Sequence, residues 1–178
     1  MNATLAAWNG LESEDAIVAL LSCCAAHRWA SALASLRPYA DEEHLFATAD
    51  RVWSTMQEPD WMGAFRAHPR IGERKAAHAS AQSKSWSQQE QSSVSEAQQS
   101  ILTELAIGNQ RYEDLFGFTY IVCATGKSAE EMLNILRRRL ASDRATELRE
   151  AAEQQRQITQ IRLRKWLQGD AQKGDAKG

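Results

Sequence analysis

Proline is scarce in this chain of 178 residues, and all three prolines lie before position 70. Proline interrupts helices because its ring removes a hydrogen-bond donor and clashes with the preceding turn. The chain after Pro69 is therefore open to uninterrupted helices. Runs of β-branched residues, which favour strands, are scarce as well. The sequence predicts an all-α fold, a single-domain helical bundle of about seven to nine helices.

Long apolar runs and concentrations of one charge are also lacking. No run approaches the roughly 20 apolar residues that a membrane-spanning helix needs. The 21 Lys and Arg residues nearly balance the 23 Asp and Glu residues, and no long basic run occurs. These features argue against a membrane or a nucleic acid as partner. The chain begins without the basic start and apolar run of a signal peptide, so we expect a cytoplasmic protein.

Cysteine is rare, and its pattern excludes two kinds of site. Cys23, Cys24 and Cys123 are odd in number and two are adjacent, which fits neither a disulfide framework nor a zinc site. Their apolar neighbours predict buried, reduced thiols. Histidines in a metal-binding pattern, glycine-rich phosphate loops and nucleophile elbows are absent too. The sequence gives no sign of a metal or an organic cofactor.

Four segments combine a capping residue with apolar residues at helical spacing. The predicted caps are Ser13, Asp41, Ser128 and Asp143. The predicted inward faces are Ile17, Leu20, Leu21 and Cys24 in the first, Leu45, Ala49, Val52 and Met56 in the second, and Met132, Leu133, Leu136 and Leu140 in the third. The fourth helix is expected to run to about Leu167. A further short helix is expected over Trp29 to Leu36.

The middle of the chain is harder to interpret. Residues 74–86 are small, polar and aperiodic, which predicts a surface loop. Ser87 is expected to start a long helix that Gly108 and Asn109 end or kink, with these residues inward: Val94, Ala97, Ile101, Leu102, Leu105 and Ala106. Residues 112–123 alternate like a strand, but a buried helix interrupted by Gly117 fits as well. Residues 169–178 are expected to be a disordered tail, which leaves residues 1–168 as the domain.

The stretch from Ala67 to Glu73 (AHPRIGE) is the most informative. Pro69 disfavours helical backbone at the residue before it, so His68 should stand where a helix stops, after a turn capped by Asp60. Histidine exchanges protons near neutral pH, and a restrained backbone suits that task. The alternative is a surface histidine before a helix-breaking proline.

Two further sites have both a structural and a functional interpretation. Ser87 and Glu90 fit the Ser-x-x-Glu capping box, but a helix N-terminus can also bind a polar ligand. Arg162 lies between Ile158 and Trp166 on an apolar helix face. An arginine there is costly unless it is paired. It either extends its charge to solvent or holds a carboxylate.

Taken in order, a series of short motifs resembles one family, 2-oxo-4-hydroxy-4-carboxy-5-ureidoimidazoline (OHCU) decarboxylase. The similarity covers about residues 8 to 167, and the motifs are specific in combination although each alone is weak. They are Trp29, Arg37-Pro38-Tyr39, Ala67-His68-Pro69-Arg70-Ile71-Gly72, Ser87-x-x-Glu90-Gln91, Phe116-Gly117-Phe118, Leu136-x-x-Arg139-Leu140 and Ile158-x-x-Ile161-Arg162-Leu163.

The resemblance implies an all-helical homodimer that converts a small-molecule ureide to (S)-allantoin and CO₂ without a cofactor or metal. It implies that His68 and Glu90 are the catalytic pair and that Arg162 and Ser87 bind substrate. Pro69 would shape the pocket beside His68. Backbone groups between Tyr120 and Val122 would face the ureide.

Two other functions remain open from the sequence. One is a non-catalytic helical module that binds ureides or acts as a scaffold, with His68 structural and Ser87/Glu90 only a cap. The other is a ureide hydrolase, which would normally need a metal or a nucleophile that the sequence does not show. A binding module would not require His, Glu and Arg together, so the sequence favours the decarboxylase.

Overall fold

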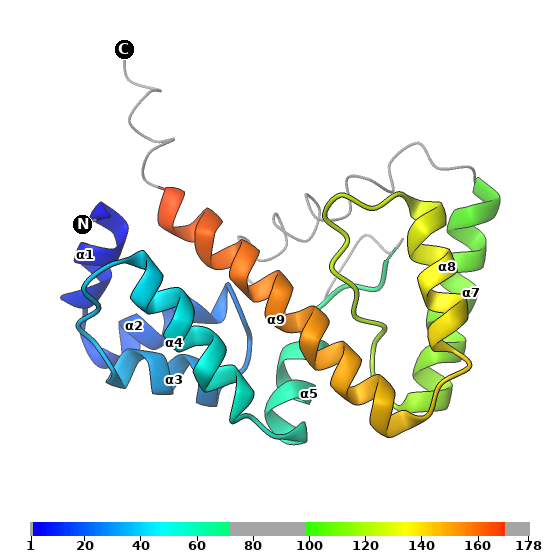
Figure 1. Cartoon of the computed structure of the whole chain (residues 1–178), viewed down its shortest axis with the longest axis horizontal. Coiled ribbons are helices and arrows are strands. Elements are labelled where there is room, and N and C mark those ends of the chain that lie inside the picture. The colour runs from blue at the N-terminus through cyan, green and yellow to red at the C-terminus, as the bar shows by residue number, and fades with distance from the viewer. Residues whose placement is uncertain (1, 72–98, 170–178) are drawn as a thin grey trace, which may run out of the picture. The chain divides into compact units, whose positions relative to one another are not determined.

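The computed structural model describes residues 2–71 and 99–169. These residues form eight helices and no strand, which confirms the predicted all-α class (Figure 1). None of the described helices is long and apolar enough to span a membrane. The helices are α1 (Ala3–Asn9), α2 (Ser13–Leu21), α3 (His27–Ser35), α4 (Glu42–Ser54), α5 (Glu58–Arg66), α7 (Gln99–Phe116), α8 (Ala129–Arg139) and α9 (Arg144–Gln168).

The chain divides into two compact units. Unit 1 contains Met1–Gly63 and Arg156–Gly178, and unit 2 contains Ala64–Gln155. The boundaries fall within α5 and within α9. The domain limits at residues 1–168 stay a prediction, and almost all of the predicted tail lies outside the described residues.

Unit 1 is built around α2, α3 and α4, which pack in sequence. Trp29 is fully buried on α3, and its indole N–H donates to the carbonyl of Ala49 on α4 at 3.1 Å. Trp8 stacks on Tyr39, with ring centroids 5.7 Å apart. The predicted short helix is confirmed by α3, and α4 begins as predicted because the Asp41 carboxylate accepts from the N–H of His44 at 2.8 Å.

Two predictions about caps in unit 1 are wrong. Glu12 occupies the cap position of α2 without a side-chain hydrogen bond, so the hydroxyl of Ser13 lies one residue too late to cap. Cys24 is buried but lies beyond the end of α2. Asp60 lies inside α5 and accepts from the N–H of Gln57 at 3.0 Å, so it supports the start of α5 rather than the turn before His68.

The first and last helices of unit 1 are joined by hydrogen bonds. Asn2 caps α1 by accepting from the N–H of Leu5 at 3.2 Å. Its amide donates to Glu42 on α4 at 2.8 Å and to the carbonyl of Leu167 on α9 at 3.0 Å. Unit 1 is therefore tied together across nearly the whole length of the chain.

In unit 2, α7 and α8 lie side by side (Figure 1). Gly108 does not end or kink α7, because the helix continues to Phe116. Gly108 instead faces Leu136 of α8, where a larger residue would have no room. Ala106 is exposed, so its predicted inward position is wrong, while Leu105 is fully buried as predicted.

The segment after α7, residues 117–128, is neither helix nor strand. Gly117 has a φ of 80°, a left-handed conformation that favours glycine and commonly ends helices. Phe118 and Tyr120–Ala124 are buried. The apolar alternation that resembles a strand therefore reflects a buried segment without regular secondary structure. The next two helices begin as predicted: Ser128 forms a capping box with Glu131 on α8, and Asp143 accepts from the N–H of Thr146 at 3.0 Å on α9.

Candidate functional site

His68 stands immediately after a helix, as the sequence predicts. Helix α5 ends at Arg66, and the N–H of His68 still donates to the carbonyl of Phe65 at 3.0 Å. Pro69 follows outside the helix, and both His68 and Pro69 are half-buried. Phe65 is fully buried and packs on Phe118 with centroids 5.5 Å apart. The backbone that carries His68 is thus anchored to the core of unit 2.

The imidazole of His68 contacts a buried glutamine of α9. Its Nε2 lies 2.7 Å from Oε1 of Gln155, whose side chain has no exposed surface. The sequence analysis missed Gln155. Its spacing could have predicted its inward position. Gln155 lies three residues before Ile158 and seven before Arg162, on the helix face already assigned as inward.

The residues after His68 are held by α7. Arg70 forms a two-pronged ion pair with Glu113, with Nε donating to Oε1 at 2.8 Å. Asn109 is buried, and its amide donates to the carbonyl of Ile71 at 3.0 Å. Asn109, expected to interrupt the helix, instead fixes the turn that follows His68.

A buried polar network supports the segment between α7 and α8, which contains Tyr120 and Val122. Arg139 donates to Glu147 at 2.7 Å and to the carbonyl of Ile121 at 2.6 Å. The Tyr112 hydroxyl donates to Glu147 at 2.7 Å. Burial acts to lower the pKa of Arg139, but Tyr112 and the carboxylate of Glu147 outweigh it, so the pKa lies above its usual value. Burial also raises the pKa of the Tyr112 phenol.

The side chains of the predicted pair Tyr120 and Val122 point into the protein. Both are buried, and the Tyr120 hydroxyl donates to the carbonyl of Met132 at 3.1 Å. The N–H of Cys123 donates to Oε1 of Gln154 at 2.8 Å. Within residues 2–71 and 99–169, the backbone N–H groups of residues 120–122 have no acceptor. This segment can therefore present backbone donors, while the side chains of Tyr120 and Val122 are buried.

Arg162 belongs to unit 1 and is only 3% exposed, so it does not extend its charge to solvent. Its surroundings include the adjacent thiols of Cys23 and Cys24. Burial raises the pKa of Cys23 to about 12 and that of Cys24 to about 11, while the charge of Arg162 acts in the opposite direction. All three cysteines are buried as predicted and are free thiols in the structure.

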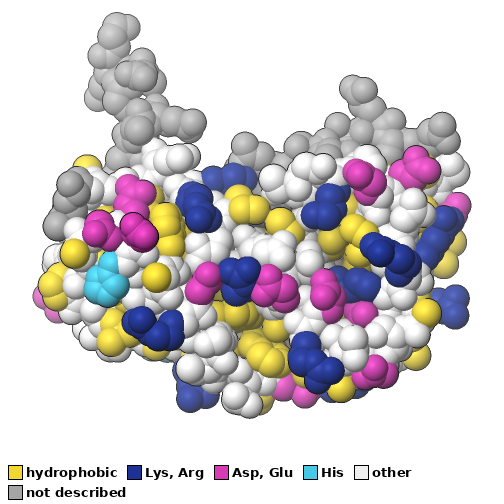
Figure 2. Space-filling view, viewed as in Figure 1, with side chains coloured by type: hydrophobic (Ala, Val, Ile, Leu, Met, Phe, Trp, Pro, Cys, Tyr) yellow, Lys and Arg dark blue, Asp and Glu magenta, His cyan; other side chains and the backbone are white. Residues whose placement is uncertain are grey.

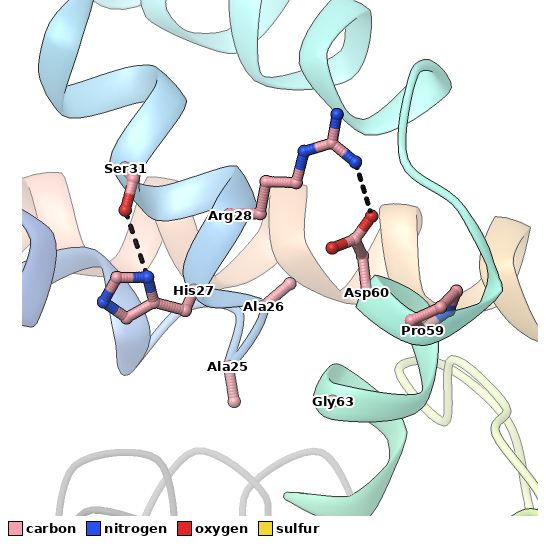
Figure 3. A pocket seen from close by; sticks show the side chains of 8 residues that line it. All are labelled: Ala25, Ala26, His27, Arg28, Ser31, Pro59, Asp60 and Gly63. Atoms are coloured by element: carbon pink, nitrogen blue, oxygen red, sulfur yellow. Dashed lines mark hydrogen bonds and ion pairs between the residues drawn. The ribbon is translucent and has the colours of Figure 1, made fainter.

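An open hollow of about 550 Å³ lies in unit 1 between the start of α3 and α5 (Figure 3). The His27 ring lies 3.2 Å from the Ser31 hydroxyl, and Arg28 lies 3.4 Å from Asp60 across the hollow. None of the predicted site residues lines it.

Ser87, Glu90 and the loop at residues 74–86 lie outside the described residues. Among the residues that are described, no group of three or more His, Cys, Asp or Glu could hold a metal ion. On the face drawn in Figure 2, acidic and basic side chains lie among one another.

Comparison with known proteins gives a consistent result. The family model of OHCU decarboxylase matches residues 9–164. The chain is 33% identical to the uric acid degradation bifunctional protein TTL of Arabidopsis thaliana over 144 residues, which cover 80% of this chain and 44% of that protein. It is 27% identical to a 2-oxo-4-hydroxy-4-carboxy-5-ureidoimidazoline decarboxylase of Amia calva, covering 78% and 79% of the two chains.

A solved structure agrees in fold. The crystal structure of an OHCU decarboxylase in the presence of (S)-allantoin superposes with a TM-score of 0.72 at 31% identity, covering 88% of this chain and 99% of that one. The chain spans less than half the length of the Arabidopsis relative, and 24% of the similar bifunctional protein of a Bacillus species.

Proposed function

Because the chain belongs to the OHCU decarboxylase family, we propose that it converts 2-oxo-4-hydroxy-4-carboxy-5-ureidoimidazoline to (S)-allantoin and CO₂ in urate degradation. The observation that carries this proposal is the match of the family model to residues 9–164, a span that contains every candidate site residue. The position of His68, held at the end of α5 and half-buried, supports it.

The chemistry needs little beyond positioned polar groups. The substrate carries its carboxylate and a hydroxyl on one ring carbon, next to an imine carbon. When the bond to CO₂ breaks, its electron pair forms a C=C bond to the neighbouring ring carbon, the π electrons of the C=N bond move onto the nitrogen, and the nitrogen takes up a proton. The hydroxyl then loses its proton to become a carbonyl as a proton is added to the neighbouring ring carbon. The substrate is its own electron sink, so the protein must orient it and move protons.

The roles proposed for the residues follow from this chemistry. His68 and Glu90 are the catalytic pair that moves protons, and Arg162 and Ser87 bind the substrate. The deep burial of Arg162 supports a role in holding an anionic or ureide group, because a buried cation requires compensation. Ser87 and Glu90 rest on the motif alone.

Two proposals concern the backbone and Pro69. Backbone N–H groups between Tyr120 and Val122 face the ureide, which is supported by their lack of acceptors in the described residues. Pro69 shapes the pocket beside His68. We further propose a cytoplasmic homodimer that acts on a small ureide and requires no cofactor. The reduced, buried thiols support a reducing compartment.

The function is tested with freshly generated urate-oxidation product, by absorbance for rate and by circular dichroism for the enantiomer formed. We expect rapid formation of one enantiomer, unaffected by dialysis against a chelator. His68→Asn should fall towards the spontaneous rate and give racemic allantoin while remaining helical, because asparagine cannot carry a proton near neutral pH. His44→Asn, at an exposed position on α4, is the matched control and should retain activity.

The overall function and the role of His68 are tested by different outcomes. Failure of the wild-type protein to accelerate the reaction or to favour one enantiomer would overturn the function. A folded His68→Asn variant with normal speed and selectivity would instead remove His68 from the mechanism.

A further inference from the structure

The ring of His68 contacts a buried side chain of α9, within unit 2. Nε2 of the ring lies 2.7 Å from Oε1 of Gln155, which is within the range of a strong N–H···O hydrogen bond. The Gln155 side chain is completely buried, whereas His68 is half-buried. The amide of Gln155 is held in place by its burial in a packed helix. Its position therefore sets the orientation of the His68 ring.

The chemistry of the contact determines which ring nitrogen carries the proton. Neutral imidazole has one N–H donor and one acceptor nitrogen. An amide oxygen can only accept, so the nitrogen that faces Oε1 of Gln155 must be protonated. Nε2 then keeps its proton in both the neutral and the charged ring. Nδ1 is the nitrogen that gains and loses a proton.

We propose that Gln155 is a positioning residue for His68: its amide oxygen holds the proton on Nε2 and directs proton exchange with the substrate to Nδ1. This inference rests on the function proposed above. It adds a residue outside the predicted site and specifies which atom of His68 reacts.

The neutral amide suits this role better than a carboxylate. A carboxylate beside the ring would stabilise the charged imidazolium. The ring would then stay protonated and could not accept a proton from the substrate. An amide orients the ring without that bias. The same helix carries carboxylates at Glu147, which is paired with Arg139, and at Glu150, which accepts from Gln154.

The neighbouring glutamine strengthens the argument from geometry. Gln154 accepts from the N–H of Cys123 at 2.8 Å, and its own amide N–H donates to Glu150 at 3.0 Å. Two consecutive residues of α9 thus hold the two candidate site segments of unit 2, His68 and the backbone after Val122. The same turn of α9 therefore positions both His68 and the backbone after Val122.

Charged residues near the His68 ring must not be substituted in the test, because a change in their charge would itself alter the pKa of the ring. Arg70, two residues after His68, is paired with Glu113 on α7. On α9, the charged residues of unit 2 closest in sequence to Gln155 are Glu150 and Glu153. The variants below change none of them.

The direct test is nitrogen NMR of the full chain labelled with ¹⁵N-histidine, with His68 assigned from the His68→Asn spectrum. We expect the neutral His68 ring to be protonated at Nε2. In Gln155→Leu, which is similar in size but has no acceptor, this preference should be lost. Turnover should fall roughly 10-fold to 100-fold with little change in KM, as for other residues that orient a functional imidazole.

A second variant tests the role of neutrality. Gln155→Glu keeps an acceptor but adds a charge, so the pKa of His68 should rise by about one pH unit or more. The acid limb of the kcat/KM profile should move in the same direction. Gln110→Glu, on the exposed side of α7, adds the same charge and should leave both unchanged.

Failure of the role proposed for Gln155 and failure of the catalytic role of His68 give different results. A wild-type His68 ring protonated at Nδ1 would overturn the inference even if neither Gln155 variant folds. So would a folded Gln155→Leu protein with normal turnover and pH profile. A ring protonated at Nε2 in an enzyme whose His68→Asn variant retains full activity would support the contact but remove the catalytic role on which the inference rests.

Discussion

Gly108 of α7 lies so close to Leu136 of α8 that a β-carbon at position 108 would be 2.6 Å from Cδ2 of Leu136. Leu136 has no exposed surface, so it has little freedom to move aside. The glycine is therefore required by the packing of two helices and not by a turn.

Gly108→Ala should lower the free energy of unfolding. Alanine gains about 1 kcal/mol of helix propensity, but overpacking typically costs about 1–3 kcal/mol, so we expect a net loss of roughly 1 kcal/mol in urea unfolding. Leu136→Val in the same chain should recover part of the loss caused by the alanine. The control is Gly63→Ala in α5, where the nearest atom to an added β-carbon is 3.7 Å away and stability should rise. Equal effects at the two glycines would contradict the packing argument.

Arg139→Met should be strongly destabilising because it leaves the Glu147 carboxylate buried without its cation. Removing one partner of a buried pair costs about 3–5 kcal/mol. Arg137→Met on the same helix is the matched control: its pair with Glu104 is exposed, and such pairs contribute at most about 1 kcal/mol. Urea midpoints that shift equally for the two variants would show that the buried network carries no special stability.

The buried thiols should make the protein less stable in alkali. The pKa of Cys23 is about 12 and that of Cys24 about 11, against 9.0 for an exposed thiol. Above pH 9 the unfolded chain loses these protons and the folded chain keeps them, so the free energy of unfolding must fall as pH rises towards 11. Chemical denaturation between pH 8 and 10.5 measures this slope.

A matched variant isolates the contribution of the thiols. Cys24→Ala should flatten the alkaline slope, and Cys123→Ala, at the third buried cysteine, is the control. An unchanged slope in the first variant would contradict the assignment. The native thiols should also resist alkylation by iodoacetamide at pH 8, since the thiolate is the reactive form.

Arg162→Lys should weaken substrate binding although it keeps the charge. Lysine lacks the planar fork that can hold two acceptor atoms, so we expect KM to rise about 10-fold or more. Arg164→Lys, two residues further on at an exposed position, is the control and should behave as wild type. Unchanged steady-state constants for both variants would remove Arg162 from the substrate site.

Local signals in the sequence predicted most of the helices. Caps such as Asp41, Ser128 and Asp143 were found because a cap and its N–H partner are three residues apart. His68 was found for the same reason, since Pro69 alone stops a helix before it. Ser13 failed by one residue, because the helix begins at Ser13 itself and Glu12 occupies the cap position without a side-chain hydrogen bond.

Positions that depend on distant partners were misjudged. Gly108 and Asn109 together favour a helix break, but their partners Leu136 and Ile71 lie 28 and 38 residues away in the chain. Gln155 was missed because a glutamine carries no functional signal until His68, 87 residues earlier, is placed beside it. The place of His68 at a helix end was predictable, and the side chain of Gln155 that contacts it was not.

The hydrogen bond from Asn2 to the carbonyl of Leu167 spans 165 residues. During synthesis, the ribosome releases the first four helices long before α9 exists. Unit 1 therefore cannot be completed until the last helix emerges, whereas every segment of unit 2 is already available by residue 155. The nascent chain must therefore carry an incomplete unit 1 through most of its translation.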